Sequence, residues 1–410
     1  MPEIVQTVLP NGLTVVAEPI PGASSLAMTL LTPAGLASQP VDQQGVAPLL
    51  AEMICRGAGG KSAREHSDAL DMLGVQRSTD AQTRFFRIGA TMIGSKMKEA
   101  LPLLFDMART PTLSEESLAP SVDLSIQAID SLADEPQRRA MLELRQQHYP
   151  DPVGRPPVGV REHLESMTID TVRKFWFEHF VAGGSILGFA GGFDPDELLA
   201  TVTDLLGDWG GKAHAAHGQG DGLGGVHHIH TDSTQVHIAL AYPTIPDTHE
   251  DRVLQQAATA VLSGGMSGRL FTEVREKRGL VYSVYATYAG QKDRGDVLAY
   301  AGTTVPRAQE TLDVLSGELR RLSEGINQSE FERAIVGMKS SLVMQGESTT
   351  ARAASIASDV YVFGQPRSLE YAASEVDAIT LKQLNAYVAQ NPPGDMTIVT
   401  LGPEPLKAGT

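Results

Sequence analysis

Two side chains seven positions apart, Arg275 and Tyr282, have the chemistry to bind an oxygen that is gaining negative charge. A guanidinium and a phenol both donate hydrogen bonds, and donors directed at one carbonyl oxygen stabilise the charge that develops there in peptide hydrolysis. The same residue types also fit a structural role, because an Arg near a helix C-terminus favours the helix dipole and Tyr is common in strands. Spacing alone leaves both interpretations open.

The surrounding residues predict the elements that would position this pair. Apolar residues at helical spacing and a basic last turn predict a helix over 267–277, which Gly279 would end in a left-handed C-cap. An alternating run rich in Val and Tyr then predicts a strand over 281–288. We therefore expect Arg275 at a helix end and Tyr282 at the start of a strand.

A longer motif contains both residues. The run SGRLFTEVREKRGLVYSV (267–284) resembles the signature in the C-terminal half of the family of pitrilysin, insulysin and the mitochondrial processing peptidase, the inverted-motif zinc peptidases. Other features similar to this family occur along nearly the whole chain. The resemblance implies that Arg275 and Tyr282 assist catalysis from across the active-site chamber, opposite the zinc.

The family's zinc motif is degenerate here. Active members carry G-x-A-H-x-x-E-H-M, with two His as zinc ligands and the Glu as general base, whereas this chain has GVAPLLAEM over 45–53. Pro48 and Glu52 replace the two His, Ala51 replaces the base, and Ala128 falls at or next to the place of the third ligand. Catalytic zinc needs three protein ligands and a water. The sequence therefore predicts no metal and no cofactor in this chain, with zinc expected in a partner subunit.

Composition limits the other classes of function. The chain has 410 residues, a formal net charge of −16 and a single cysteine, Cys55. The negative charge argues against nucleic acid or an anionic membrane surface as a partner, and one cysteine excludes an intrachain disulfide framework. No apolar run approaches a membrane span, and the N-terminus shows no leader pattern. We expect a cytoplasmic protein, or a periplasmic one if a leader has been removed.

Length and composition indicate two domains separated by a linker. The segment 208–225 is rich in glycine and has no hydrophobic periodicity, which is typical of a linker. The order of predicted elements over 235–345 repeats the order over 24–147. Together with the resemblance, this predicts an α+β fold of two tandem homologous domains, each an antiparallel sheet with helices packed on one face, with the degenerate zinc site in the first domain.

These observations predict the non-zinc subunit of a heterodimeric zinc metalloendopeptidase. A homologous partner with H-x-x-E-H would supply zinc and base, while Arg275 and Tyr282 would bind peptide and stabilise the carbonyl oxyanion; this chain alone would be inactive. Two alternatives stay open: an inert scaffold homologue, and a peptide-binding chamber without proteolysis. Whether a homodimer also forms is open too.

Three glycines, Gly264, Gly265 and Gly268, open the motif. They are similar in place to a glycine-rich segment of the mitochondrial non-zinc subunit that is tied to substrate handling. Close packing of backbone at the helix start explains them equally well.

Overall fold

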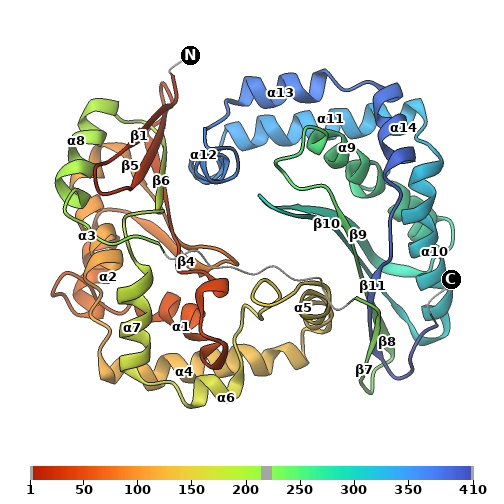
Figure 1. The fold of residues 1–410 in the computed structure, drawn as a ribbon, viewed down its shortest axis with the longest axis horizontal. Helices are drawn as coiled ribbons and strands as arrows, with labels where there is room; N and C mark the ends of the chain where they lie inside the picture. The colour runs from red at the N-terminus through yellow and green to blue at the C-terminus, as the bar shows by residue number, and fades with distance from the viewer. Residues whose placement is uncertain (1–2, 214–223, 408–410) are drawn as a thin grey trace. The chain divides into compact units, whose positions relative to one another are not determined.

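The computed structural model describes residues 3–213 and 224–407 and divides into two compact units. Unit 1 comprises Met1–Ser131, Asp151–Gly220 and Gln345–Arg367, and unit 2 comprises Leu132–Pro150, Asp221–Met344 and Ser368–Thr410. Each unit contains one β-sheet with helices on it (Figure 1). The predicted α+β fold with two domains is confirmed.

The sheet of unit 1 has six strands in the order β1-β2-β6-β3-β5-β4. The first two strands form a hairpin. Gly12 adopts φ 89° in its turn, and Val8 pairs with Thr14 across the strands. All neighbours are antiparallel except β2 and β6, which run parallel. The strands are β1 (Val5–Val8), β2 (Thr14–Pro19), β3 (Ser25–Thr32), β4 (Gln76–Ala81), β5 (Phe86–Ile93) and β6 (Ile186–Gly191).

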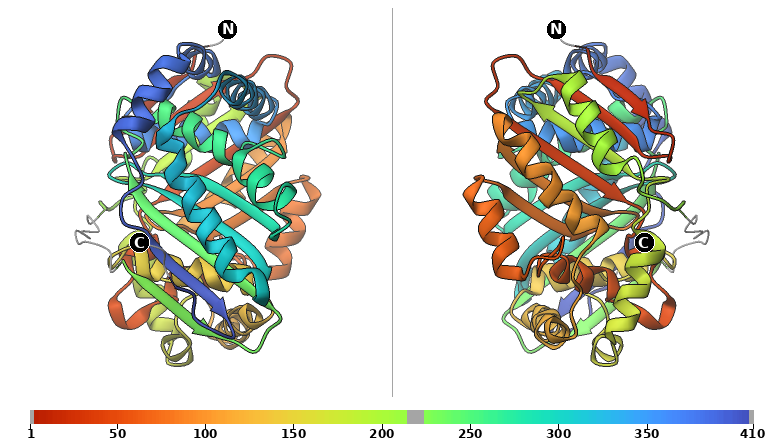
Figure 2. Two further views of the ribbon diagram at one scale, coloured as in Figure 1. Left: turned by 90° about the vertical axis from the view of Figure 1, so that its right-hand side faces the viewer. Right: turned by 90° about the vertical axis from the view of Figure 1, so that its left-hand side faces the viewer.

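Helices cover one face of this sheet and enclose the main core of unit 1. Figure 2 (right) shows these helices in front of the sheet. Apolar side chains of β2, β3, β5 and β6 meet those of α1, α3, α7 and α8 there. Helix α1 begins after Gly45, and the buried Gln39 amide oxygen accepts from the Gly45 and Ala47 backbone N–H groups at 2.8 and 3.0 Å. The helices are α1 (Val46–Met53), α2 (Ala63–Met72), α3 (Met97–Arg109), α4 (Glu115–Asp130), α6 (Arg161–Glu165), α7 (Ile169–His179) and α8 (Pro195–Leu206).

The second face of the unit 1 sheet is covered by α12 (Thr349–Phe363), from the C-terminal half of the chain. Its apolar face packs on β2, β3 and β6 through Ala353, Ile356, Ala357 and Val360, a spacing that lines one side of a helix. A Cβ at Gly188 would lie 2.5 Å from the Ala353 carbonyl oxygen, so glycine permits this close approach.

The sheet of unit 2 has five strands in the order β7-β11-β8-β10-β9. Its neighbours are antiparallel except β7 and β11, which run parallel. The register between β9 and β10 shifts at Gly302 and Thr303. The strands are β7 (Val226–His230), β8 (Gln235–Thr244), β9 (Val281–Gly290), β10 (Gly295–Thr304) and β11 (Thr397–Gly402).

One face of this sheet packs on most helices of unit 2. Figure 2 (left) shows these helices in front of the sheet. Alternate residues of β8, β9 and β10 belong to a core shared with α9, α10 and α14. The helices are α9 (Arg252–Ser263), the π-helix η5 (Phe271–Glu276), α10 (Ala308–Arg321), α11 (Gln328–Gly346), α13 (Leu369–Asp377) and α14 (Leu381–Gln390).

The second face of the unit 2 sheet is partly covered by α5 (Pro136–His148), from the N-terminal half of the chain. Ala140 and Leu144 pack on β8 and β11. At the end of the helix, the buried His148 ring lies 2.8 Å from the Asp296 carboxylate through Nε2 and 2.8 Å from the Thr397 hydroxyl through Nδ1. This contact fixes α5 to the sheet.

Three details of the fold differ from the sequence prediction. Each sheet contains one parallel pair, and each has a helix on its second face, because α12 and α5 bury apolar faces there. The compact units also depart from the contiguous ranges 1–207 and 226–410, since these two helices join the unit formed mainly by the other half of the chain.

The predicted linker 208–225 is described only at its ends. Residues 214–223 lie outside the described residues. At its start, Trp209 is buried in unit 1, where its indole N–H donates to the Phe180 carbonyl oxygen at 3.1 Å. Residues 208–213 therefore pack as part of unit 1.

Candidate functional site

Arg275 lies in a short, tightly anchored π-helix. The predicted α-helix over 267–277 is instead η5, in which Leu270 and Val274 are buried on one side and Arg275 is exposed on the other. Gly279 follows with φ 60°, which ends the turn as expected. A π-turn is frequent at functional sites because its extra residue per turn redirects side chains.

The cations at the end of η5 have different contacts. Lys277 Nζ lies 2.7 Å from one Glu273 carboxylate oxygen, and Arg278 Nη1 lies 3.0 Å from the other. The Lys277 hydrogen bond in particular holds the pKa of Glu273 below its usual value. The Arg275 guanidinium instead lies over the Phe271 ring, 4.9 Å from its centroid, and makes no carboxylate ion pair within 3–213 or 224–407. Its hydrogen-bonding edge is thus not occupied by an acid.

Tyr282 lies at a β-bulge of the edge strand β9. Val281 pairs with Thr303 and Ser283 pairs with Gly302, so Tyr282 is the extra residue. A bulge redirects a side chain, and Tyr282 is 47% exposed. Its hydroxyl donates to the Gln235 amide oxygen at 3.1 Å. The phenol is therefore held in place while part of the ring stays accessible.

Gly302 on β10 leaves the space that the tip of the Tyr282 ring occupies. A Cβ at this position would lie 2.6 Å from both Cζ and the hydroxyl oxygen of Tyr282, and 2.9 Å from the hydroxyl of Tyr300. Such distances are too short for real contacts. The missing side chain therefore allows two phenol groups to converge over one point of the sheet.

Behind Tyr282, a buried pair continues the polar contacts. The Tyr300 hydroxyl lies 2.7 Å from His237 Nδ1 and, like the Tyr282 hydroxyl, within 3 Å of the point where a Cβ of Gly302 would stand. Burial, together with the neighbouring phenol of Tyr282, raises the pKa of Tyr300, and burial lowers the pKa of His237. Both groups are consequently neutral at pH 7.

Arg275 and Tyr282 lie on consecutive elements, but no hydrogen bond joins them in the part of the chain that the structure describes. Each instead has a separate neutral support, the Phe271 ring for one and the Gln235 amide for the other. Two donors without an acidic partner are suited to an acceptor such as a peptide carbonyl oxygen or a carboxylate.

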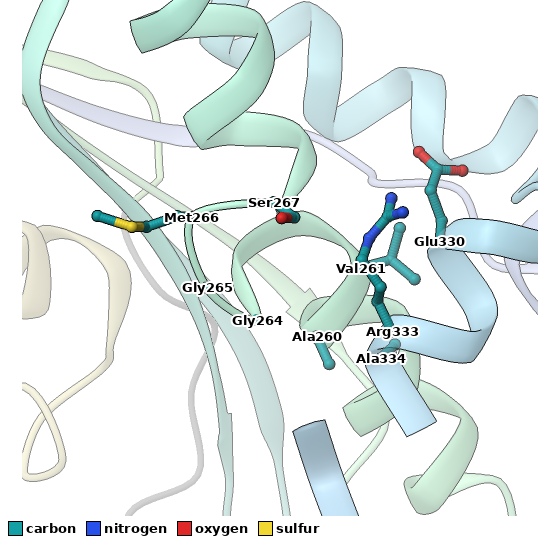
Figure 3. Close-up of a pocket in the computed structure, with 10 residues that line it drawn as sticks. Ala260, Val261, Gly264, Gly265, Met266, Ser267, Glu330, Arg333 and Ala334 are labelled. Carbon is teal, nitrogen blue, oxygen red and sulfur yellow. The ribbon is translucent and has the colours of Figure 1, made fainter. Parts of the chain in front are cut away.

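The three glycines line a small pocket of about 170 Å³ between α9 and α11 (Figure 3). Gly265 adopts φ 134°, and a Cβ at Gly268 would lie 2.8 Å from the Leu262 carbonyl oxygen, so backbone conformation and close packing explain these two glycines. Beside them, Met266 is 74% exposed and points away from Glu330 (Figure 3). Substrate binding by the segment stays a prediction.

The degenerate zinc positions lie on α1 and α4 of unit 1. Pro48 falls in the first turn of α1, where its missing N–H breaks no helical hydrogen bond. The Ala51 carbonyl oxygen accepts from the Thr79 hydroxyl at 2.8 Å, and the Ala128 carbonyl accepts from Ser131 at 2.9 Å. Glu52 accepts from Arg56 at 2.7 and 3.1 Å.

This donor set does not fit zinc. Pro48, Ala51 and Ala128 have no ligating side-chain atom, and the Glu52 carboxylate is neutralised by Arg56. Over residues 3–213 and 224–407, no group of three His, Cys, Asp or Glu side chains is placed to hold a metal ion.

Known proteins of one family are similar to this chain. Residues 166–338 match the model described as the peptidase M16 inactive domain. An uncharacterized zinc protease of Bacillus subtilis is 26% identical over 402 residues, covering 96% of this chain and 97% of that protein. One of Rickettsia felis is also 26% identical, covering 87% of each chain.

The chain is therefore similar to the M16 peptidase family. Solved structures share the M16 fold along its whole length. A peptidase M16 inactive domain from Pseudomonas fluorescens has a TM-score of 0.86 at 21% identity, covering 99% of this chain and 100% of that one. A protease from Helicobacter pylori has a TM-score of 0.85 at 18% identity, covering 98% and 100%. The predicted resemblance is confirmed.

Sequence reasoning missed several residues around the Tyr282 phenol. Gln235 and His237 are two apart on an alternating strand, so they were readable as polar residues on one face opposite an apolar face. Gly302 inside the β10 run was a sign of close approach. Their link to Tyr282 depends on strand register, which this signal does not contain.

The described helices also bear on membrane association. Within residues 3–213 and 224–407, no helix is both long and apolar enough to span a bilayer.

Proposed function

We propose that this chain is the non-zinc subunit of a two-chain zinc metallopeptidase. The observation that carries the proposal is the contrast at the end of η5. Lys277 and Arg278 both form ion pairs with Glu273, whereas the Arg275 guanidinium forms none among the described residues and lies over an aromatic ring. A lone cation beside an accessible phenol suits recognition of an anionic oxygen.

In this proposal, Arg275 and Tyr282 act on the peptide rather than on water. The Tyr282 hydroxyl exchanges its contact with the Gln235 amide for the scissile carbonyl oxygen, and Arg275 donates to the same oxygen or to a neighbouring carbonyl. Both contacts strengthen as negative charge develops on that oxygen. A homologous partner subunit with H-x-x-E-H would supply zinc and the general base, because the donor set on α1 and α4 does not.

The test is peptidase activity on an unstructured peptide. The chain is assayed alone and then mixed with a zinc-motif homologue encoded in the same genome, with and without a chelator. We expect activity only in the mixture and its loss with the chelator. Tyr282→Phe should slow turnover by about 10² to 10³-fold while the zinc content of the mixture stays constant. An unchanged rate for Tyr282→Phe would exclude the catalytic role.

The same experiment distinguishes the alternatives. A stable complex without activity in any mixture would favour a scaffold, in which the pair has no catalytic use. Peptide binding by this chain alone, without cleavage, would favour a binding chamber. Zinc bound at one ion per chain on α1 and α4 would contradict the assignment of the metal to a partner.

A further inference from the structure

Three polar contacts link four side chains across the second face of the unit 2 sheet. His237 Nδ1 lies 2.7 Å from the Tyr300 hydroxyl, and the Tyr282 hydroxyl lies 3.1 Å from the Gln235 amide oxygen. The Tyr300 and Tyr282 hydroxyls both lie within 3 Å of the point where a Cβ of Gly302 would stand. The inner end is fully buried, with His237 at 2% exposure and Tyr300 at 0%, whereas Tyr282 and Gln235 reach solvent.

The number of hydrogens fixes the direction of these contacts. A hydrogen bond at each of these three contacts needs three hydrogens, and the two phenols supply one each. The Gln235 amide oxygen supplies none, so the third hydrogen must come from His237 Nδ1. The other ring nitrogen, Nε2, is buried and has no hydrogen-bond partner in the described structure. It is then a bare lone pair rather than an orphaned N–H, and orphaned buried N–H groups are rare.

We propose that His237 and Tyr300 are positioning residues that make Tyr282 a donor. The Nδ1–H of His237 donates to Tyr300, Tyr300 donates to Tyr282, and Tyr282 is left with its own O–H directed outward. The Gln235 amide oxygen accepts that hydrogen until a substrate oxygen replaces it; this last step rests on the proposed function.

Direction matters because the reverse chain would disable Tyr282. If Tyr282 donated inward to Tyr300, its oxygen would present lone pairs to the substrate and repel a developing oxyanion. A chain of aligned donors also polarises each member, which strengthens the outermost O–H as a donor. The buried, neutral His237 therefore acts through its tautomer and not by transferring a proton.

The tautomer can be read in this chain alone. Long-range proton–nitrogen NMR on ¹⁵N-histidine-labelled protein, with the signal assigned through His237→Asn, reports which ring nitrogen is protonated. We expect a proton on Nδ1 and none on Nε2. A proton on Nε2 alone would mean that the Gln235 amide is reversed and would overturn the proposal. Tyr300→Phe should change the tautomer population. Tyr288→Phe is the control and should leave it unchanged, because Tyr288 lies on β9 and its hydroxyl donates to the Ile245 carbonyl oxygen.

A rate measurement adds the link to catalysis. In the mixture with the zinc-motif homologue, Tyr300→Phe should lower kcat about 10-fold with KM within about twofold, less than the loss for Tyr282→Phe. Tyr282→Phe combined with Tyr300→Phe should be no slower than Tyr282→Phe, because the inner residue acts only through the outer one. Equal additional loss in the double variant would contradict the relay.

The two proposals fail separately. An Nδ1–H tautomer with no rate loss in Tyr282→Phe would keep the hydrogen-bond chain and reject the peptidase role. A rate loss in Tyr282→Phe with an Nε2–H tautomer would keep the peptidase role and reject the hydrogen-bond chain.

Discussion

Gly302→Ala is expected to separate catalysis from stability. The added Cβ would lie 2.6 Å from the tip of the Tyr282 ring, and an ordinary contact begins at 3.4 Å, so the phenol must move by about 0.8 Å. The ring tip moves rather than the sheet, because it is the far end of a half-exposed side chain. A misplacement near 1 Å in a reacting group costs about 10²-fold in rate, or about 2.7 kcal/mol in activation free energy.

The effect on folding combines a backbone gain with one buried contact, because the added Cβ would also lie 2.9 Å from the hydroxyl of the buried Tyr300, which must shift by about 0.5 Å. Gly302 lies inside β10 and is not among the glycines with positive φ, so alanine fits its backbone. Replacing glycine in a strand interior gains about 0.5–1 kcal/mol, which offsets the cost of moving the ring. We expect a melting temperature equal to or above that of the unchanged chain.

The assay is kcat on an unstructured peptide in the mixture with the zinc-motif homologue, beside thermal unfolding of the chain alone. Gly317→Ala is the matched control, because Gly317 lies in α10 and a Cβ there meets nothing within 4 Å. In a Tyr282→Phe background, Gly302→Ala should cause no further loss. A full rate in Gly302→Ala, with the ring seen to be displaced, would refute the reasoning.

Three further predictions test other contacts. Arg275→Ala should slow the two-chain enzyme about 10²-fold, whereas Arg278→Ala should change the rate less than twofold, since its ion pair is exposed; equal effects in the peptide assay would contradict the contrast. His148→Ala removes the partner of a buried carboxylate and should lower the free energy of unfolding in urea by about 3 kcal/mol; an unchanged midpoint would count against the anchor. Burial alone would raise the pKa of Glu330, but the hydrogen bond from Arg269 lowers it, and the net pKa in the folded state is lowered. The Glu330 carboxylate therefore contributes its full stabilisation above about pH 4.3, the pKa of an unfolded Glu. That stabilisation is lost as pH falls through the lower folded-state pKa. Urea unfolding at pH 7 and pH 3 should show a smaller pH dependence for Glu330→Gln; an equal dependence would reject this origin.

Local sequence signals predicted the frame of the site correctly. Gly279 ends the turn that contains Arg275, and the alternating run after it forms β9 with Tyr282 near its start. These features depend on backbone conformation and side-chain alternation over a few residues, which the sequence contains directly.

The helix type and the exact placement of Tyr282 could not be predicted in this way. An apolar face at 270, 271 and 274 fits an α-turn and a π-turn equally, and tertiary packing of Leu270 and Val274 decides between them. The bulge at Tyr282 depends on which residue of β10 lies opposite, and β10 is distant in sequence. The contact of His237 with Tyr300 spans 63 positions for the same reason.

The helices α5 and α12 show another limit. The spacing of Ala353, Ile356, Ala357 and Val360 reveals an apolar face, but it does not reveal which sheet that face covers. Because each sheet leaves part of its second face apolar, the choice is made by the whole fold.

The exchange of α5 and α12 has a consequence for the order in which the chain folds during synthesis. A ribosome releases the strands of unit 1 long before α12, so the apolar face formed by Val16, Leu31 and Ile186 stays uncovered until residue 363 has emerged. Helix α5 is synthesised before β8 and β11, so its apolar face also stays uncovered until those strands have emerged. We therefore expect that neither half, expressed as a separate fragment, folds to a native unit, and that nascent chains need protection from aggregation until nearly the whole polypeptide is made.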